Sequence, residues 1–139
     1  MKKGTRISKI MTKEVITLNL KDDLESAELL FKQNNIRHIP VVNNKSVVGI
    51  LSYTDLLRIS FADAVYEDEE TIDTIVYNMF TIEQVMVKNV VSVSSNTSIK
   101  EVAEIFATKE FHALPVVDDD VLVGIVTTTD LIKYLLKQL

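Results

Sequence analysis

The apolar residues in the first half of the chain alternate between two patterns, namely the spacing of a helix and the short runs of strands. Leu24, Ala27 and Phe31 recur at the spacing of a helix that buries one face. Before and after this stretch, apolar and β-branched residues form short runs, which are typical of buried strands. These runs are Val15–Leu18, His38–Val42 and Val47–Ser52.

Polar residues with known cap and turn preferences separate these elements. Asp22 or Asp23 can cap the first helix, and Glu25 is placed to form the reciprocal half of a capping arrangement with Asp22. Asn43–Ser46 joins the two later strands, and because asparagine tolerates positive φ, this connection predicts a hairpin. A second helix is expected to open at Thr54.

The same order of elements returns in the second half of the chain. An offset of 75 residues takes Pro40 to Pro115 and Gly49 to Gly124, and it pairs residues 7–64 with 82–139 without a gap. This repeat predicts two small α/β units in a pseudo-twofold pair with a shared core. The expected elements are a strand at Val90–Val93, a helix capped by Ser98 with Glu101, strands at Ala113–Val117 and Val121–Thr127 around a hairpin at Asp118–Asp120, and a last helix.

The organisation that follows is repeat 1 at residues 7–62, a connecting segment at 63–80 and repeat 2 at 81–139. The connecting segment holds the acidic run Glu67–Glu70, followed by apolar residues at helical spacing, and it predicts an amphipathic helix with a solvated acidic start. A cation site at this run, or at Asp118–Asp120, is the less favoured alternative to solvated residues. The last helix carries more apolar residues than one face needs, so part of it is expected to pack on another subunit.

A motif at the end of each repeat carries the candidate chemistry. Gly49–Asp55 and Gly124–Asp130 both follow the pattern G-x-x-[S/T]-x-x-D, in which an apolar strand ends at hydroxyl residues and an aspartate opens a helix. Such a turn presents backbone N–H groups and the positive end of a helix dipole, which can hold a phosphate. The two oxygens of a carboxylate suit neighbouring ribose hydroxyls. Plain helix capping is the alternative use of the same residues.

Composition and charge exclude several classes of function. The net charge of −5 argues against a general nucleic-acid binder, which needs basic stripes. The chain has no cysteine, which rules out disulfides and thiolate chemistry. Neither a signal peptide nor a run long enough to span a membrane is present, so a cytoplasmic protein is expected. No metal-ligand cluster and no Ser/His/Asp arrangement indicates an enzyme.

The doubled pattern resembles a tandem pair of cystathionine-β-synthase (CBS) domains, also called a Bateman module. The likeness rests on M-x-x-x-V-x-[T/S], a capped helix, h-P-V-V, a hairpin and G-I-h-[S/T]-x-x-D-L, and it covers roughly residues 7–139. It implies an α/β (α+β) fold of two pseudo-symmetric β-α-β-β-α repeats that pack through their sheets and leave two clefts. A stand-alone CBS-pair protein that forms a homodimer through its helices is the expectation.

The resemblance also implies a ligand and its contacts. Such modules typically bind AMP, ADP, ATP, S-adenosylmethionine, NAD or cyclic di-AMP, and they need no cofactor. Asp55 and Asp130 would hold ribose hydroxyls, and Arg37 and His112 stand where the family often places a phosphate-contacting side chain. For His112, a partly buried residue hydrogen-bonded to the backbone is an equal alternative. The other candidate contacts are Thr17, Ser52, Thr54, Ser92, Thr127 and Thr129.

The leading hypothesis is a non-catalytic sensor that binds an adenosine-containing ligand between the repeats and signals to an unidentified protein. The second hypothesis is a ligand-free dimerisation or interaction module. Loss of both aspartates would separate them, because only the sensor would lose ligand binding. An enzyme that hydrolyses or transfers a group is the third and least supported hypothesis.

Overall fold

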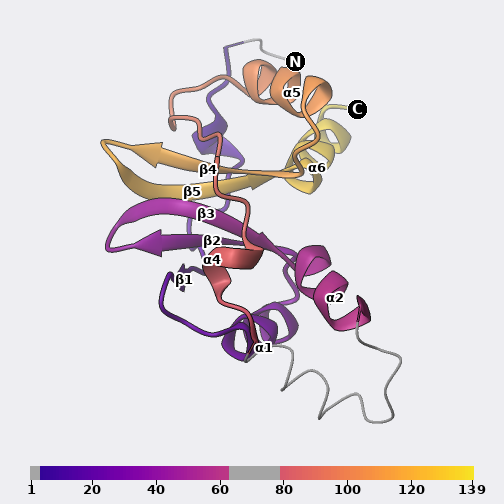
Figure 1. Cartoon of the computed structure of the whole chain (residues 1–139). Helices are drawn as coiled ribbons and strands as arrows, with labels where there is room; N and C mark the ends of the chain where they lie inside the picture. Colours follow the sequence, from indigo (N-terminus) through magenta and orange to yellow (C-terminus); the bar gives the residue numbers. More distant parts are fainter. Residues whose placement is uncertain (1–3, 63–78) are drawn as a thin grey trace. The chain divides into compact units, whose positions relative to one another are not determined.

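The computed structural model describes residues 4–62 and 79–139. Over these residues the fold is a mixture of helices and strands, in which each repeat has its own sheet and helices, as predicted (Figure 1). The acidic run Glu67–Glu70 and most of the connecting helix predicted at 63–80 lie outside the described residues. None of the described helices is both long enough and apolar enough to span a lipid bilayer.

The chain forms two compact units that do not coincide with the two sequence repeats. The middle unit is Ile16–Val90, and the terminal unit combines Met1–Val15 with Val91–Leu139. Each unit therefore contains the sheet and paired helices of one repeat together with the lead-in segment of the other repeat. These lead-in segments are Met1–Val15 in the terminal unit and the residues that end at Val90 in the middle unit. The expected packing of the two sheets against each other stays a prediction.

The middle unit contains a three-stranded sheet in the order β1-β2-β3. Strand β1 runs parallel to β2, and β2 pairs antiparallel with β3 through a tight hairpin. The elements are β1 (Leu18–Asn19), α1 (Leu24–Asn34), β2 (His38–Asn43), β3 (Ser46–Ser52), α2 (Tyr53–Ala62) and α4 (Ile82–Val85).

The terminal unit repeats this arrangement with a two-stranded antiparallel sheet, β4-β5. The N-terminal segment is tied to the residues before α5, since the Ile7 amide donates to the Thr97 carbonyl at 2.7 Å. The elements are a 3₁₀ turn η1 (Ile7–Lys9), α5 (Ile99–Thr108), β4 (Ala113–Asp118), β5 (Val121–Thr127) and α6 (Thr128–Gln138).

The first strand of each repeat is shorter than the sequence predicts. Instead of Val15–Leu18 the structure has β1 at Leu18–Asn19, and instead of Val90–Val93 it has a single parallel bridge from Val93 to Val116. The Val93 amide donates to the Pro115 carbonyl (3.1 Å), and the next rung upstream would need an amide hydrogen from Pro115 itself. Proline has none, so the ladder stops there, and Pro40 has the same place beside β1.

Local capping explains where the first helix begins. Asp23 Oδ1 accepts from the Ser26 amide at 2.8 Å, so Asp23 is the N-cap. The arrangement predicted for Asp22 with Glu25 is wrong, because Asp22 Oδ2 accepts from the Asn19 amide instead, at 2.8 Å.

Residues with positive φ end this helix and close both hairpins. Asn35 is left-handed at φ 52°, and Asn44 turns the first hairpin at φ 60°. In the second hairpin Asp119 and Asp120 have φ of 49° and 64°, the conformation of a two-residue primed turn. These aspartates therefore form a turn, and no group of three acidic or histidine side chains among the described residues is placed to hold a metal.

Each lead-in segment joins the sheet of the other repeat through a two-way backbone bridge. Val87 and Ile50 exchange hydrogen bonds of 2.9 and 3.1 Å in the middle unit, and Thr12 and Ile125 exchange bonds of 2.8 and 2.9 Å in the terminal unit. The methionine just before each bridge, Met86 or Met11, lies against a strand glycine. A Cβ on Gly49 would collide with the Met86 sulfur, and one on Gly124 would collide with the Met11 sulfur. Both methionines therefore act as packing residues.

The two hydrophobic cores are separate sets of residues. In the middle unit Phe31 is 2% exposed and its ring meets Tyr53 edge-on, at 5.2 Å between centroids. In the terminal unit Ile7 is fully buried although it comes from the lead-in segment. Ile82 has the same position in the middle unit, also fully buried. The lead-in segments are thus parts of the cores.

Candidate functional site

In the middle unit, four of the predicted residues gather where the sheet meets α2. Ser52 ends β3, and Thr54 and Asp55 lie in the first turn of α2. Arg37 precedes β2, and its carbonyl accepts from the Tyr53 amide at 2.9 Å, which ties the start of β2 to the start of α2. The Ser52 hydroxyl accepts from the Asp55 amide at 3.0 Å. The hydroxyl therefore caps the helix, and the Asp55 carboxylate is left for other partners.

In the terminal unit, the corresponding residues form a complete capping box. Thr127 Oγ1 accepts from the Asp130 amide at 3.1 Å, and Asp130 Oδ2 accepts from the Thr127 amide at 2.9 Å. His112 is exposed, so the alternative of a partly buried imidazole is wrong; its carbonyl accepts from the Thr128 amide at 3.1 Å. Thr129 is exposed on the first turn of α6.

Thr17 and Ser92 lie at the start of the parallel pairing in the sheet of their unit. Thr17 directly precedes β1, and Ser92 directly precedes the bridging residue Val93. Both are exposed. Their hydroxyls are therefore available to a ligand or to solvent.

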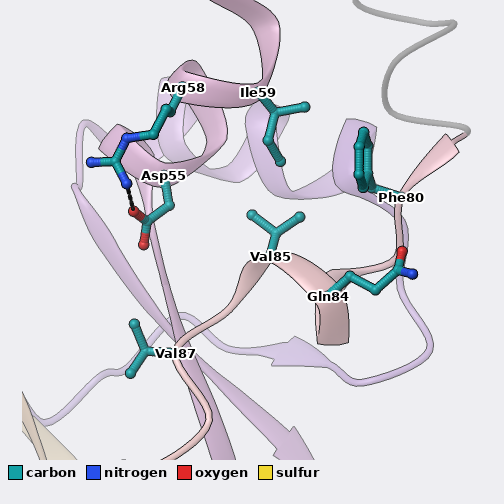
Figure 2. A pocket seen from close by; sticks show the side chains of 7 residues that line it. All are labelled: Asp55, Arg58, Ile59, Phe80, Gln84, Val85 and Val87. Carbon is teal, nitrogen blue, oxygen red and sulfur yellow. Dashed lines mark ion pairs between the residues drawn. The ribbon is translucent and has the colours of Figure 1, made fainter. Parts of the chain in front are cut away.

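A pocket of about 490 Å³ opens inside the middle unit beside Asp55. Helix α2 lines it with Asp55, Arg58 and Ile59, which share one face because they are three and four residues apart. Figure 2 shows the Asp55–Arg58 pair at one side of the pocket and Phe80 and Gln84 at the other. The remaining wall comes from Val85 and Val87.

The far wall of this pocket is built by helix α4 and the lead-in bridge. Thr81 caps α4 in a reciprocal box, in which Gln84 Oε1 accepts from the Thr81 amide at 2.9 Å and Thr81 Oγ1 accepts from the Gln84 amide at 3.2 Å. Val87 is fixed on β3 by its bridge to Ile50. Capping and bridging thus hold the apolar wall in place opposite α2.

The charged side chains described at the pocket form one ion pair. Arg58 Nη1 lies 3.4 Å from Asp55 Oδ1. The Asp55 side chain is 24% exposed and the Arg58 side chain is 74% exposed. Among the lining residues that the structure describes, these two are the charged ones, and Gln84 is the one amide.

Arg37 lines a second pocket, which does not include Asp55. This pocket measures about 300 Å³ and lies between the end of α1 and the start of α2. It is lined by Phe31, Lys32, Asn35, Ile36, Arg37 and Tyr53. The structure therefore places Arg37 and Asp55 at the same end of the sheet but in different pockets.

Sequence reasoning did not identify Arg58 or the apolar wall. Arg58 could have been found from its i+3 spacing to Asp55 in the predicted helix. Val85 and Val87 could not, because they belong to the segment that leads into the other repeat. Their packing on repeat 1 becomes visible only in the folded unit.

Comparison with known proteins identifies relatives of this arrangement. The sequence profile of the CBS domain matches residues 7–62 and again residues 82–137. The CBS domain-containing protein YhcV of Bacillus subtilis is 31% identical over 121 residues, which cover 87% of this chain and 79% of that protein. The uncharacterized protein MJ1225 of Methanocaldococcus jannaschii is 29% identical over 129 residues, 92% of this chain but 46% of the relative. The chain thus spans about half the length of that relative.

Two solved structures have the same fold over nearly the whole chain. The crystal structure of MJ1225, described as a putative archaeal homolog of g-AMPK, has a TM-score of 0.82 at 28% identity and covers 97% of this chain and 49% of that one. The CBS domain pair of protein MJ0100 was crystallised with 5′-methylthioadenosine and S-adenosyl-L-methionine. It has a TM-score of 0.81 at 26% identity and covers 97% of this chain and 98% of that one.

Proposed function

The chain belongs to the CBS domain family, and on this premise we propose that it is a non-catalytic regulatory module that binds an adenosine-containing ligand. The observation that carries the proposal is the pocket of the middle unit. It places a half-buried carboxylate, which its own helix cap leaves available, beside an apolar wall. That combination suits a nucleoside, which has a diol on its sugar and a flat apolar base.

The chemistry of the lining residues matches the two parts of such a ligand. The Asp55 carboxylate can accept hydrogen bonds from two adjacent ribose hydroxyls. Ile59, Val85 and Val87 offer apolar surface to the base. The pocket volume of about 490 Å³ is within the range of small-molecule sites, roughly 300–1,000 Å³.

The bound ligands of a relative support the same class of ligand. MJ0100 was crystallised with two adenosine derivatives, and it is similar to this chain over almost its entire length. Thr17, Ser52 and Thr54 are the further contacts that we propose for the middle unit. Ser92, His112, Thr127, Thr129 and Asp130 are the contacts that we propose for the terminal unit. Ligand binding would shift the population between two arrangements of the module, and a protein partner would respond to that shift.

A ligand-free interaction module is the second candidate, and α6 is the observation that favours it. Ile132, Leu135 and Leu136 are 57%, 43% and 64% exposed, and α6 buries none of its residues fully. Exposed apolar side chains grouped on one helix are typical of surfaces that contact another protein. A second copy of the chain is the occupant we propose, in a homodimer that either function could use.

A binding experiment with the purified protein tests the ligand proposal. Adenosine, AMP, ADP, ATP and S-adenosylmethionine would each be added while thermal unfolding is recorded. A ligand present at about a hundred times its dissociation constant should stabilise the native state by about 2.7 kcal/mol. Asp55→Ala should abolish this shift if the pocket of the middle unit is the site.

Glu25→Ala is the matched control, because it removes the same charge from an exposed position in α1 of the same unit. It should leave the ligand-induced shift unchanged. Absence of a shift with every ligand would contradict the proposal. If the Asp55→Ala/Asp130→Ala double variant then kept the oligomeric state of the wild type, the interaction module would be the better account.

A further inference from the structure

We propose that Arg58 determines which adenosine ligands the pocket of the middle unit accepts, by selecting those that carry an anionic group such as a 5′-phosphate. The inference rests on the proposed function, because it assumes that Asp55 takes up the ribose. It adds a second contact that neither the motif nor the family match assigns. Arg58 lies outside the G-x-x-[S/T]-x-x-D pattern, three residues beyond its aspartate.

The ion pair between Arg58 and Asp55 is easily displaced. Its N–O distance of 3.4 Å exceeds the usual 2.7–2.9 Å of a charge-assisted hydrogen bond. The guanidinium is 74% exposed, and ion pairs at such positions contribute little because solvent screens them. The hydroxyls of a ribose can therefore replace Arg58 at the carboxylate.

The Asp55 carboxylate has no competing backbone partner in the part of the chain that the structure describes. The cap of α2 is supplied by the Ser52 hydroxyl, which accepts from the Asp55 amide. In α6 the corresponding carboxylate of Asp130 is bound to the Thr127 amide at 2.9 Å. A ligand at Asp55 thus exchanges one exposed ion pair for its own hydrogen bonds, without breaking a helix cap.

The displaced guanidinium can then bind the ligand in its turn. Among the seven described residues that line this pocket Arg58 is the one cation, and apart from Asp55 the other five are apolar or neutral. Figure 2 shows it at the same side of the pocket as Asp55. A ligand held by its ribose at Asp55 would have its 5′ substituent on the same sugar ring, within the region that Arg58 can sweep. Arginine offers a forked set of donors that matches phosphate oxygens.

The selectivity depends on whether the bound ligand gives the displaced guanidinium a new anionic partner. Uncharged adenosine would displace the guanidinium and leave it to solvent. A phosphorylated ligand would displace it and then pair with it. The overall charge of −5 makes this local contact more important, because the chain as a whole does not attract anions. We expect AMP to bind about three- to tenfold more tightly than adenosine, the range of a partly exposed charge pair.

Calorimetric titration of AMP and of adenosine into the full chain tests the inference. Arg58→Gln should weaken AMP binding by about three- to tenfold and leave adenosine binding equal or slightly tighter, because Asp55 is then free. Lys133→Gln is the matched control, since Lys133 stands at the same repeat position in α6. It should leave the ratio of the two affinities in the middle unit unchanged.

The outcomes separate this inference from the function on which it rests. If the wild type binds both ligands and Arg58→Gln leaves their affinity ratio unchanged, the role of Arg58 is overturned and the adenosine pocket stands. Equal weakening of both ligands by Arg58→Gln is one form of that result. If the wild type binds neither ligand, the proposed function fails and this inference fails with it. Thermal unfolding of each variant verifies that an exposed substitution has not altered the fold.

Discussion

The two units use the same aspartate of the same motif in different ways. In the terminal unit the Asp130 carboxylate accepts from the Thr127 amide and completes a capping box. In the middle unit the Ser52 hydroxyl caps the helix, and the Asp55 carboxylate faces Arg58 across 3.4 Å. A carboxylate that caps its own backbone already has one oxygen engaged. A carboxylate paired with an exposed arginine at a pocket can exchange that arginine for the hydroxyls of a ligand.

The surroundings of the two aspartates differ as well. The offset of 75 residues places Lys133 for Arg58, Tyr134 for Ile59, Ile10 for Val85 and Thr12 for Val87. The apolar wall of the middle unit thus becomes more polar at the equivalent positions. The same motif therefore occurs at the same position of both units, but the side chains around it give the two positions different chemical surroundings. This favours the middle unit as the first place to look for binding.

The largest difference that we expect between the units is in their cores. Phe31 is 2% exposed and packs on Tyr53, whereas its counterpart Phe106 is half-buried and has Thr128 in place of the tyrosine. Phe31→Ala should lower the free energy of unfolding by about 3–5 kcal/mol, and Phe106→Ala by about half as much. Urea unfolding of the two variants measures this. Equal losses would mean that the two cores are equivalent despite the different exposure.

The aspartates themselves should show opposite rankings for stability and for binding. Asp130→Ala removes half of a capping box and should cost about 1 kcal/mol, whereas Asp55→Ala removes an exposed ion pair and should cost less, about 0–1 kcal/mol. Ligand affinity in the middle unit should fall only with Asp55→Ala. Thermal unfolding gives the first ranking and calorimetry the second. Asp130→Asn, which keeps an oxygen acceptor, should recover most of the stability.

The smallest difference is a response to acid that one hairpin has and the other lacks. Asp118 accepts from the Ser95 hydroxyl at 2.5 Å and from the Ser95 amide at 3.0 Å, and these bonds lower the pKa of its carboxyl. Because the pKa is lower in the folded state, the stabilisation is present above the ordinary aspartate range and is lost as the pH falls through the folded value. At the same position the middle unit has Asn43, which does not titrate.

The measurement is the midpoint of thermal unfolding between about pH 7 and about pH 3. The wild type should lose more stability over this interval than Asp118→Asn, which cannot lose a charge there. Asp23, whose pKa the Ser26 hydroxyl and amide lower, adds a local response in the middle unit that both proteins share. Parallel pH profiles for the two proteins would show that the contact between Ser95 and Asp118 does not depend on its charge.

Much of the fold could be predicted because it depends on properties of single residues. Asn35 and Asn44 end a helix and turn a hairpin since asparagine tolerates positive φ, and the structure has them at 52° and 60°. Ser98 caps α5 through the Glu101 amide at 3.1 Å, as its spacing indicates. The repeat offset then carried the same elements into the second half.

The remaining features depend on contacts between distant residues. The length of the first strands depends on Pro40 and Pro115, which lack the amide hydrogen that a further rung would need. The pocket depends on the backbone bridge between Val87 and β3, two segments far apart in the sequence, which no local pattern predicts. The motif alone singles out Asp55, whereas the role that we propose for Arg58 depends on its side-chain contact with Asp55 at the pocket.

Each lead-in segment belongs to the unit of the other repeat, and this affects the order in which the chain can fold during synthesis. The middle unit is one continuous stretch, Ile16–Val90, so all of its contacts are available once that stretch has emerged from the ribosome. The terminal unit needs Met1–Val15 together with Val91–Leu139. Its bridging residue Thr12 must therefore wait for Ile125, and closing so long a loop is intrinsically slow. Met1–Val15 precede the middle unit in the sequence and are thus made before it, yet they are among the last segments to form their contacts.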